Sequence, residues 1–263
     1  MATPIIELDN ISAFRGDHPV FQQLNLTIHA GEKVAILGPN GAGKSTFLKL
    51  ITREIYPLDR DDSRLALFGK ERFTIWSLRE QLGVISQDLQ DQYTPYTTGI
   101  EVILSGFFGA VGSHGHLQPS EVQIQQAEAM LDKVGMGTER NSLFDALSTG
   151  QRRRLLVGRA LIHNPSTLIF DEPTNGLDIR ATAQLLKLMR EHCQQQDHGL
   201  LLTTHHVDEI IPEIERVIVL QDGKIIADGE KQDVLNSELL SHLYNTQVEL
   251  QQRNGFYRLW IDA

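Results

Sequence analysis

The chain has 263 residues, of which 41% are hydrophobic and 22% are charged, and its formal net charge is −10. This length can bury a large core, and the acidic balance argues against a general nucleic-acid-binding surface. No apolar run approaches the ~20 residues that span a bilayer, and the N-terminus lacks the basic and apolar regions of a signal peptide. Cys193 is the only cysteine. A disulfide within the chain is therefore excluded, and a reducing cytosol is favoured.

The N-terminal residues predict a small antiparallel sheet followed by a buried strand. Residues 5–28 form two runs of alternating apolar and polar side chains, and the sequence Gly-Asp-His-Pro at 16–19 separates them with strong turn residues. The apolar run at 33–37 is typical of a buried strand. Further short strands are expected at 64–68 and 83–86, the second ending at Gln87.

The stretch that follows the buried strand matches the phosphate-loop pattern G-x-x-x-x-G-K-[ST]. Its glycines let backbone N–H groups approach phosphate oxygens, and residues 47–51 continue as a helix whose N-terminus attracts anions. Lys44 would reach the β- and γ-phosphates, and the Ser45 hydroxyl would ligate Mg²⁺. A turn without a ligand is the alternative. The predicted nucleotide-binding residues here are Gly38, Pro39, Asn40, Gly41, Ala42, Gly43, Lys44, Ser45 and Thr46.

The middle and the end of the chain predict an α/β protein. Helical periodicity runs from Thr97 to about His163 and includes a helix that starts at Ser120 and stops at Gly135, which indicates a helical subdomain. Strands and helices then alternate, which indicates a largely parallel sheet. The expected elements are strands at 167–170 and 199–204, a helix at 179–196, a hairpin at 217–227, and a short helix with two strands after 237.

Two acidic residues follow the apolar strand at 167–170. Asp171 stands where a second Mg²⁺ contact belongs, and Glu172 can act as a base or orient the water that attacks the γ-phosphate. The alternative is a polar strand end that leads into a turn. Further back, Ser148 can cap the helix that follows it and present N–H groups to an anion. A cap without a ligand is the alternative there.

Taken together, these motifs resemble those of the ATP-binding-cassette (ABC) ATPases, and the resemblance covers roughly residues 5–235. Six motifs stand in the order of that family, and a chance assembly with this spacing is not credible. They are a Walker A loop at 38–46, a Q-loop at Gln87, a signature at 147–151, a Walker B strand at 168–172, a D-loop at 175–178 and a switch histidine at His205.

The resemblance implies a P-loop NTPase fold of ABC type, with a mostly parallel core, an N-terminal antiparallel β subdomain and an inserted helical subdomain. It implies a single ATP-binding domain over residues 1–263. The expected parts are the core and β subdomain at about 1–96 and 164–235, the helical subdomain at about 97–163, and a C-terminal extension at about 236–263.

The resemblance also implies how ATP and Mg²⁺ are used. Two copies would face each other head to tail, with each ATP between one Walker A loop and the partner's signature. Asp178 would contact the other copy. The catalytic residues implied are Lys44, Gln87, Glu172 and His205; the Mg²⁺ ligands are Ser45, Gln87 and Asp171; the residues binding nucleotide in trans are Ser148, Thr149, Gly150 and Gln151.

Two positions depart from the family pattern. Thr149 replaces the usual signature glycine; its N–H remains, so a modest effect is expected. The aromatic residue that stacks on adenine is not evident, and Phe14 or Arg15 occupies its neighbourhood. His114 and His116 lie in a glycine-rich stretch and are interpreted as part of an exposed loop rather than as a metal site.

The family resemblance suggests an ATPase subunit that lies in the cytoplasm on the inner face of the cell membrane. It would drive separate permease subunits, and a substrate-binding protein is a further partner that the resemblance allows. Residues 204–212 resemble molybdate-uptake and photorepair-type ATPases, and residues 235–260 resemble those of iron-chelate and vitamin B12 importers. Import of a metal, metal chelate or cofactor is therefore expected, while export stays open.

Two other functions compete with transport. The first is a cassette ATPase of DNA repair or translation, although the chain has neither the heptads nor the paired cysteines of repair relatives, nor the second cassette of translation relatives. The second is a nucleotide-binding regulator without turnover, against which Glu172 argues. Co-purification with a membrane protein separates transport from the first, and steady-state ATP hydrolysis separates both from the second.

Overall fold

The computed structural model describes residues 3–72, 78, 81–111 and 118–261 of the chain. The backbone divides into two compact units. The first unit consists of Met1–Ile75 together with Cys193–Ala263, and the second consists of Trp76–His192. His114 and His116 lie outside the described residues.

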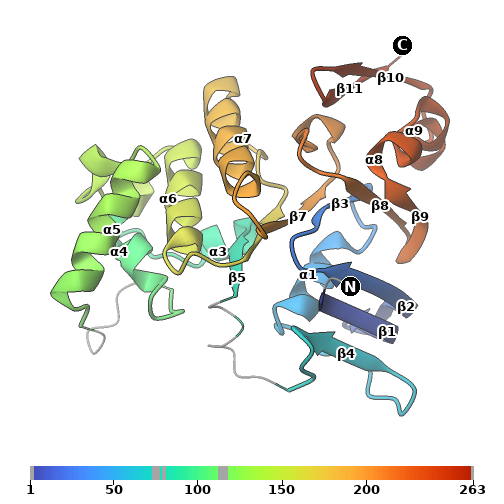
Figure 1. Cartoon of the computed structure of the whole chain (residues 1–263), viewed down its shortest axis with the longest axis horizontal. Coiled ribbons are helices and arrows are strands. Elements are labelled where there is room, and N and C mark those ends of the chain that lie inside the picture. The colour runs from blue at the N-terminus through green and yellow to red at the C-terminus, as the bar shows by residue number, and fades with distance from the viewer. Residues whose placement is uncertain (1–2, 73–77, 79–80, 112–117, 262–263) are drawn as a thin grey trace. The chain divides into compact units, whose positions relative to one another are not determined.

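The first unit contains the predicted antiparallel sheet. Its strands are β1 (Pro4–Arg15), β2 (His18–His29) and β4 (Arg64–Leu67), in the order β2-β1-β4 (Figure 1). Burial alternates along residues 24–29 of β2, so one face of that strand is buried, whereas the central strand β1 has consecutive buried residues at 5–6 and 11–13. The expectation of two antiparallel strands before the phosphate loop is confirmed.

A parallel sheet forms the core of the same unit. Strand β3 (Lys33–Leu37) lies between β7 (Gly199–Thr204) and β8 (Arg216–Gln221) and runs parallel to both. Strand β9 (Lys224–Glu230) pairs antiparallel with β8. Strands buried on both faces read as continuous apolar runs rather than alternating ones, which explains the sequences of β3 and β7.

The C-terminal extension has the predicted short helix and two strands. Helix α8 (Lys231–Val234) and helix α9 (Ser237–Tyr244) precede the antiparallel hairpin of β10 (Val248–Arg253) and β11 (Phe256–Ile261). The Asn236 side chain caps α9 by accepting a hydrogen bond from the Leu239 N–H.

Two-residue turns close the hairpins β8–β9 and β10–β11 of this unit. Asp222 and Gly223 have φ of 47° and 72°, and Asn254 and Gly255 have φ of 52° and 80°. Left-handed residues at both turn positions match the twist of the flanking strands. A Cβ on Gly223 would stand 1.7 Å from the carbonyl oxygen of Val20, so this turn also needs glycine because another backbone approaches it.

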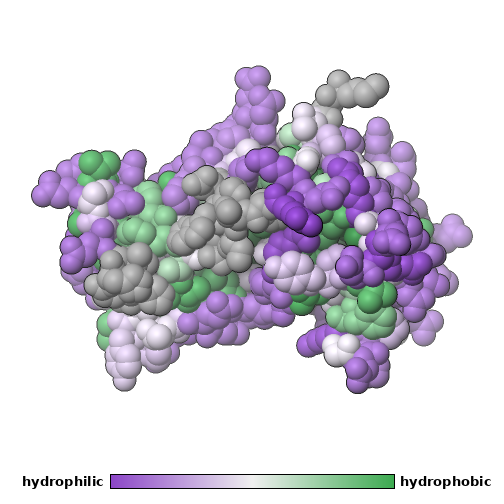
Figure 2. All heavy atoms as spheres, turned by 90° about the horizontal axis from the view of Figure 1, so that it is seen from below, coloured by the Kyte–Doolittle hydropathy of each residue, from purple (hydrophilic) through white to green (hydrophobic). Residues whose placement is uncertain are grey.

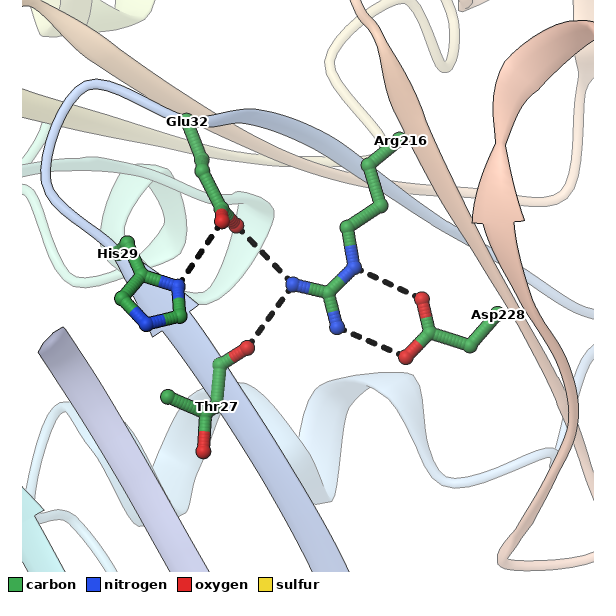
Figure 3. A network of polar contacts seen from close by, with 5 residues as sticks. All are labelled: Thr27, His29, Glu32, Arg216 and Asp228. Atoms are coloured by element: carbon green, nitrogen blue, oxygen red, sulfur yellow. Dashed lines mark hydrogen bonds and ion pairs between the residues drawn. The ribbon is translucent and has the colours of Figure 1, made fainter. Parts of the chain in front are cut away.

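A charged network joins β2, β8 and β9 (Figure 3). The Arg216 guanidinium makes two bonds of 2.7 Å to the Asp228 carboxylate, and its third nitrogen lies 3.0 Å from Glu32 and 2.9 Å from the Thr27 carbonyl. Glu32 also bonds the His29 ring at 3.0 Å. The hydrogen bonds to Asp228 raise the pKa of the Arg216 guanidinium above its ordinary value. The arginine therefore connects the antiparallel sheet to the parallel sheet.

The second unit combines a parallel strand pair with helices. Strand β5 (Leu82–Ile85) pairs in parallel with β6 (Thr167–Asp171). Helices α4, α5 and α6 lie side by side in Figure 1, which confirms the helical character expected between residues 97 and 163. The helices are α3 (Gln87–Asp91), α4 (Gly99–Ser105), α5 (Glu121–Lys133), α6 (Thr149–Leu161) and α7 (Ile179–Cys193), and the 3₁₀ turns η1 (Gly137–Glu139) and η2 (Phe144–Ala146) precede α6.

The start of α5 follows from local capping residues, whereas the end of α7 depends on the strand that comes after it. Helix α5 starts as predicted, because Ser120 and Gln123 form a reciprocal capping box. Helix α7 stops at Cys193, three residues before the expected Gln196. The chain turns there into β7, and Asp197 takes a left-handed conformation with φ of 60°.

The single thiol is buried. Cys193 is 6% exposed, and burial raises the pKa of its thiol to about 12. Because only the thiolate is a good nucleophile or metal ligand, Cys193 acts as a small apolar core residue.

Large apolar side chains on the surface are scattered. Among the large apolar side chains of the described residues, Ile179 at 91% and Tyr96 at 81% are the most exposed. On the face drawn in Figure 2, most of the coloured surface is hydrophilic and the green areas are small. No helix in the described part of the chain has the length and apolar character that crossing a bilayer requires.

The substitution Arg216→Ala should lower the free energy of unfolding by about 2 kcal/mol, because it removes both hydrogen bonds to the half-buried Asp228 carboxylate and one of the two partners of Glu32. Urea denaturation measures this loss. Arg60 is a matched control, since its pair with Asp62 is more exposed. Arg60→Ala should cost less than about 0.5 kcal/mol. Equal losses for the two variants would show that the network contributes no more than a surface ion pair.

Candidate nucleotide-binding and hydrolysis site

The predicted phosphate loop has strand, turn and helix in the required order. Strand β3 ends at Leu37, and helix α1 (Lys44–Ile51) begins at the lysine of the loop. Gly41 and Gly43 have φ of 85° and 111°, a region that side chains other than glycine rarely adopt. No acidic residue stands in the first turn of α1. The partial positive charge of the helix N-terminus therefore remains available to an anion.

Close packing also requires the glycines at both ends of the loop. A Cβ on Gly38 would stand 2.2 Å from the carbonyl oxygen of Leu220 in β8, and one on Gly43 would stand 3.0 Å from the ring of Phe21 in β2. The Gly223 N–H donates to the Ala42 carbonyl at 3.0 Å. The loop is thus fixed by the β8–β9 turn as well as by β2.

Lys44 lies across its own loop. Its side chain is 5% exposed, and Nζ donates to the carbonyls of Gly38 at 2.7 Å and Pro39 at 3.1 Å. A flexible four-carbon stem allows the ammonium to turn to a phosphate without moving the backbone. The neighbouring Ser45 is exposed, whereas Thr46 is buried.

The structure brings His205 to the same sheet edge as this loop. Leu37 of β3 pairs with Thr204 of β7, and the Gly38 N–H donates to the Thr204 carbonyl at 3.1 Å. His205 follows Thr204 directly and is partly buried. Residues separated by more than 160 positions in the sequence thus meet because the two strands are parallel neighbours.

The two candidates for the adenine contact end strand β1. Phe14 is 43% exposed, and Arg15 is exposed beside it. Strand β2 returns from their hairpin, and its residues Val20 and Phe21 approach Gly43. The hairpin therefore lies near the loop, and stacking of either side chain on a base stays a prediction.

In the second unit, the parallel strand pair β5–β6 places Gln87 and Asp171 at the carboxyl ends of its strands. Ile85 pairs with Phe170, Gln87 opens helix α3, and Asp171 ends β6. Glu172 comes next with φ of 43°. A left-handed backbone costs about 1–2 kcal/mol in a residue with a Cβ, and such strain gathers at functional positions.

Gln87 has a buried partner that the sequence did not reveal. Arg153 is fully buried, and its guanidinium donates to Gln87 Oε1 at 3.0 Å. Gln87 Nε2 donates in turn to Asp91 at 2.7 Å. The three consecutive arginines at 152–154 were the available signal, but their spacing did not show which of them points inward.

The signature turn and the D-loop lie side by side within the second unit. A Cβ on Gly150 would stand 2.7 Å from the Ala181 Cβ, and one on Gly176 would stand 3.9 Å from the Thr149 side chain. Asp178 caps α7 by accepting from the Ala181 N–H at 2.7 Å. The turn and the loop therefore support each other.

Ser148 caps helix α6, as predicted. Gln151 N–H donates to Ser148 Oγ at 3.3 Å, and Ser148 N–H donates to Gln151 Oε1 at 2.9 Å. Gln151 also donates from Nε2 to Glu139 at 3.2 Å. Ser148 and Thr149 are exposed, so the start of the helix faces solvent.

Comparison with known proteins identifies the family. The sequence profile of the family described as "ABC transporter" matches residues 21–175. An ABC transporter ATP-binding protein of Geobacter sulfurreducens is 35% identical over 234 residues, which cover 89% of this chain and 86% of that protein. The chain belongs to the ABC transporter ATPase family. It is the ATP-binding, ATP-hydrolysing subunit of an ABC transporter.

Other relatives of this ABC ATPase include the phosphonates import ATP-binding protein PhnC of Alcaligenes faecalis, 28% identical over 92% of this chain and 89% of that protein. A metal-chelate type ABC transporter has the same fold with a TM-score of 0.78, at 23% identity over 98% of this chain and 97% of that one.

Two further solved structures resemble this ABC ATPase. One is cbiO1 of Clostridium perfringens, described as part of the ABC transporter complex cbiONQ (TM-score 0.72, 26% identity, 92% and 95% covered). The other is the cassette MJ0796, a dimer in a post-hydrolysis state bound to ADP and phosphate (TM-score 0.71, 25% identity, 86% and 98% covered). The predicted P-loop fold of ABC type, with its mostly parallel core, is confirmed.

Gly38→Ala should lower the free energy of unfolding by about 3 kcal/mol or more, because the new methyl group collides with the backbone of β8. Gly41→Ala is the matched control, since nothing lies within 4 Å of its Cβ position. Only the left-handed strain applies there, which costs about 1 kcal/mol. Urea denaturation of both variants measures the difference, and an equal loss would contradict the close approach of Leu220.

Proposed function

We propose that this ABC ATPase closes head to tail with a second copy on ATP and Mg²⁺ and drives a separate membrane permease that imports a metal, metal chelate or cofactor. The observation that supports the proposed dimer is the exposed surface that the signature turn and the D-loop form together. Ser148, Thr149 and Asp178 are exposed there, and the apolar Ile179 beside them is 91% exposed. The dimeric state of the MJ0796 cassette supports this pairing.

Phosphate binding falls to the loop of residues 38–46. Its backbone N–H groups, with the N-terminus of α1, cradle the phosphate oxygens, and Lys44 exchanges its two loop carbonyls for the β- and γ-phosphates. In the dimer, residues 148–151 of the partner copy bind the same nucleotide. Thr149 keeps its N–H, so the threonine changes this contact little.

The side chains proposed for Mg²⁺ suit that ion. Ser45, Gln87 and Asp171 all have side-chain oxygen, which is the donor that Mg²⁺ takes. To ligate the ion, Gln87 Oε1 would leave the Arg153 guanidinium, which donates to it at 3.0 Å. Among the described residues, no group of three His, Cys, Asp or Glu forms an alternative metal site. When bound, Mg²⁺ supplies charge neutralisation at the β- and γ-oxygens.

Hydrolysis requires a water molecule held in line with the γ-phosphate. We propose that Glu172 orients and deprotonates this water. Its left-handed backbone sets the direction in which the side chain leaves the chain. His205 contacts the γ-phosphate, and the buried Arg153 holds the Gln87 side chain that monitors the same phosphate. These residues position charge rather than form covalent bonds, as phosphoryl transfer demands.

The proposed contact with the permease is the helical part at about 97–163, near Gln87–Phe108. Tyr96 is 81% exposed and Leu143 is 44% exposed, and such apolar side chains suit a protein interface. The cbiO1 structure supports a separate permease, because that ATPase is part of a multiprotein complex. The ATPase would then act in the cytoplasm, bound to the inner face of the membrane.

Import is favoured over export by the PhnC relative, which is an import ATPase. The preference for a metal, chelate or cofactor rests on the resemblance of residues 204–212 and 235–260 to the importer ATPases named in the sequence analysis.

The rival function is that of an ABC ATPase of DNA repair or translation. Affinity purification of the tagged full chain from detergent-solubilised membranes tests the choice. Recovery of a multi-span membrane protein supports transport, and recovery of ribosomes or DNA with no membrane protein supports the rival.

Glu172→Gln should bind ATP normally, reduce steady-state hydrolysis by at least about 100-fold and elute as a dimer with ATP, because the neutral amide cannot deprotonate water. Gel filtration with and without ATP, together with phosphate release, measures these effects. Glu191→Gln, on the surface of α7, is the control and should behave like the unmodified protein. An ATP-loaded Glu172→Gln monomer would contradict the head-to-tail dimer.

Lys44→Ala should reduce hydrolysis by at least about 100-fold, because the phosphates lose their fixed positive charge. Lys49→Ala, on the same helix α1, removes an equal charge away from the loop and should leave the rate unchanged. Phosphate release at saturating ATP gives both rates. Normal turnover by the Lys44 variant would contradict the proposed phosphate contact.

A further inference from the structure

The C-terminal extension packs against the segment that carries His205. Strand β11 lies against the short 3₁₀ turn η3 (Val207–Glu209), which follows His205. A Cβ on Gly255 would stand 2.9 Å from the Pro212 Cβ. Just before the extension, Lys231 of α8 donates from Nζ to the carbonyls of Ile211 at 3.2 Å and Pro212 at 2.8 Å. All these residues belong to the first unit.

The last residue of helix α9 reaches the switch residue itself. The Tyr244 hydroxyl donates to the backbone carbonyl of His205 at 2.9 Å. The tyrosine is partly buried, and burial raises the pKa of its hydroxyl to about 12. It therefore remains a hydrogen-bond donor throughout the physiological pH range. Asn245 ends the helix in a left-handed conformation, which fixes Tyr244 in the last turn.

The other side of this turn is fixed by its own side chains. Thr204 Oγ1 makes a short hydrogen bond with the Glu209 carboxylate, which is 1% exposed. The same hydroxyl accepts from the His206 N–H at 2.8 Å. The rings of His205 and His206 lie 3.9 Å apart. The backbone around His205 is thus held from the core by Thr204 and from the extension by Tyr244.

We propose that Tyr244 is a positioning residue for hydrolysis: its hydroxyl holds the His205 carbonyl and so fixes the direction in which the His205 imidazole is presented. The C-terminal extension then sets the rate of the hydrolytic step through one hydrogen bond. This rests on the proposed function, in which His205 contacts the γ-phosphate. The phosphate loop has its own anchors on β2, β8 and the β8–β9 turn, so ATP binding should not depend on Tyr244.

Tyr244→Phe removes the hydroxyl and keeps the ring. We expect kcat for ATP to fall by about tenfold, because small misplacements of a reacting group cost one to two orders of magnitude. KM for ATP should stay within about twofold. The control is Tyr257→Phe: Tyr257 is buried in the same extension, and no hydrogen bond of its hydroxyl occurs within the described residues. Its kcat and KM should both be unchanged.

Nuclear magnetic resonance of the histidine rings distinguishes a failure of this proposal from a failure of the proposed function. The His205 ring resonances, assigned with His205→Ala, should shift in Tyr244→Phe and stay in place in Tyr257→Phe. Unshifted resonances or an unchanged kcat in Tyr244→Phe would overturn the proposal. Unchanged hydrolysis in His205→Ala would instead overturn the assigned role of His205.

A double variant completes the test. If Tyr244 acts through His205, then adding Tyr244→Phe to His205→Ala leaves the residual rate unchanged. If the two losses multiply, Tyr244 acts independently of His205 and the proposal fails, while the role of His205 in the proposed function stands.

Discussion

The parallel pairing of β3 with β7 is the constraint on which the first half of the site depends. Leu37 and Thr204 are register partners, and the next peptide continues the contact from the Gly38 N–H to the Thr204 carbonyl. The phosphate loop and His205 therefore leave the sheet at one edge. In a parallel sheet all strands present their carboxyl ends on the same side, so residues from distant parts of the sequence can converge there. The pair β5–β6 applies the same rule to Gln87 and Asp171.

The loop itself combines backbone freedom with tight surroundings. Gly43 needs its left-handed φ, whereas Gly38 needs the absence of a side chain because the β8 backbone approaches it. Strand β8 is held in turn by the ion pair of Arg216 with Asp228 and by the bond to the Thr27 carbonyl of the antiparallel sheet. In the proposed function, a rigid frame of this kind would hold the loop N–H groups in place for phosphate, so little reorganisation of the loop backbone would be needed.

ATP hydrolysis by a transporter subunit has to be coupled to events elsewhere, and we propose two places where such coupling acts. In the second unit, the signature turn and the D-loop share one exposed surface that suits a partner copy. In the first unit, Tyr244 connects the C-terminal extension to the backbone of His205.

The sequence by itself determined the elements and the family, because these depend on local patterns. Ser120 marked a helix start, the residues 16–19 marked a turn, and the glycines around Lys44 marked the phosphate loop. Local patterns could not decide whether Phe14 or Arg15 contacts adenine. Both side chains are exposed at the end of β1.

Only the tertiary structure decided which partners hold the site residues. Arg153 meets Gln87 across 66 positions, Tyr244 meets His205 across 39, and Arg216 meets the Thr27 carbonyl across 189. The same arginine or tyrosine could have faced solvent without changing any local pattern. Such contacts arise from the packing of whole elements against one another, and neither periodicity nor motif spacing records that packing.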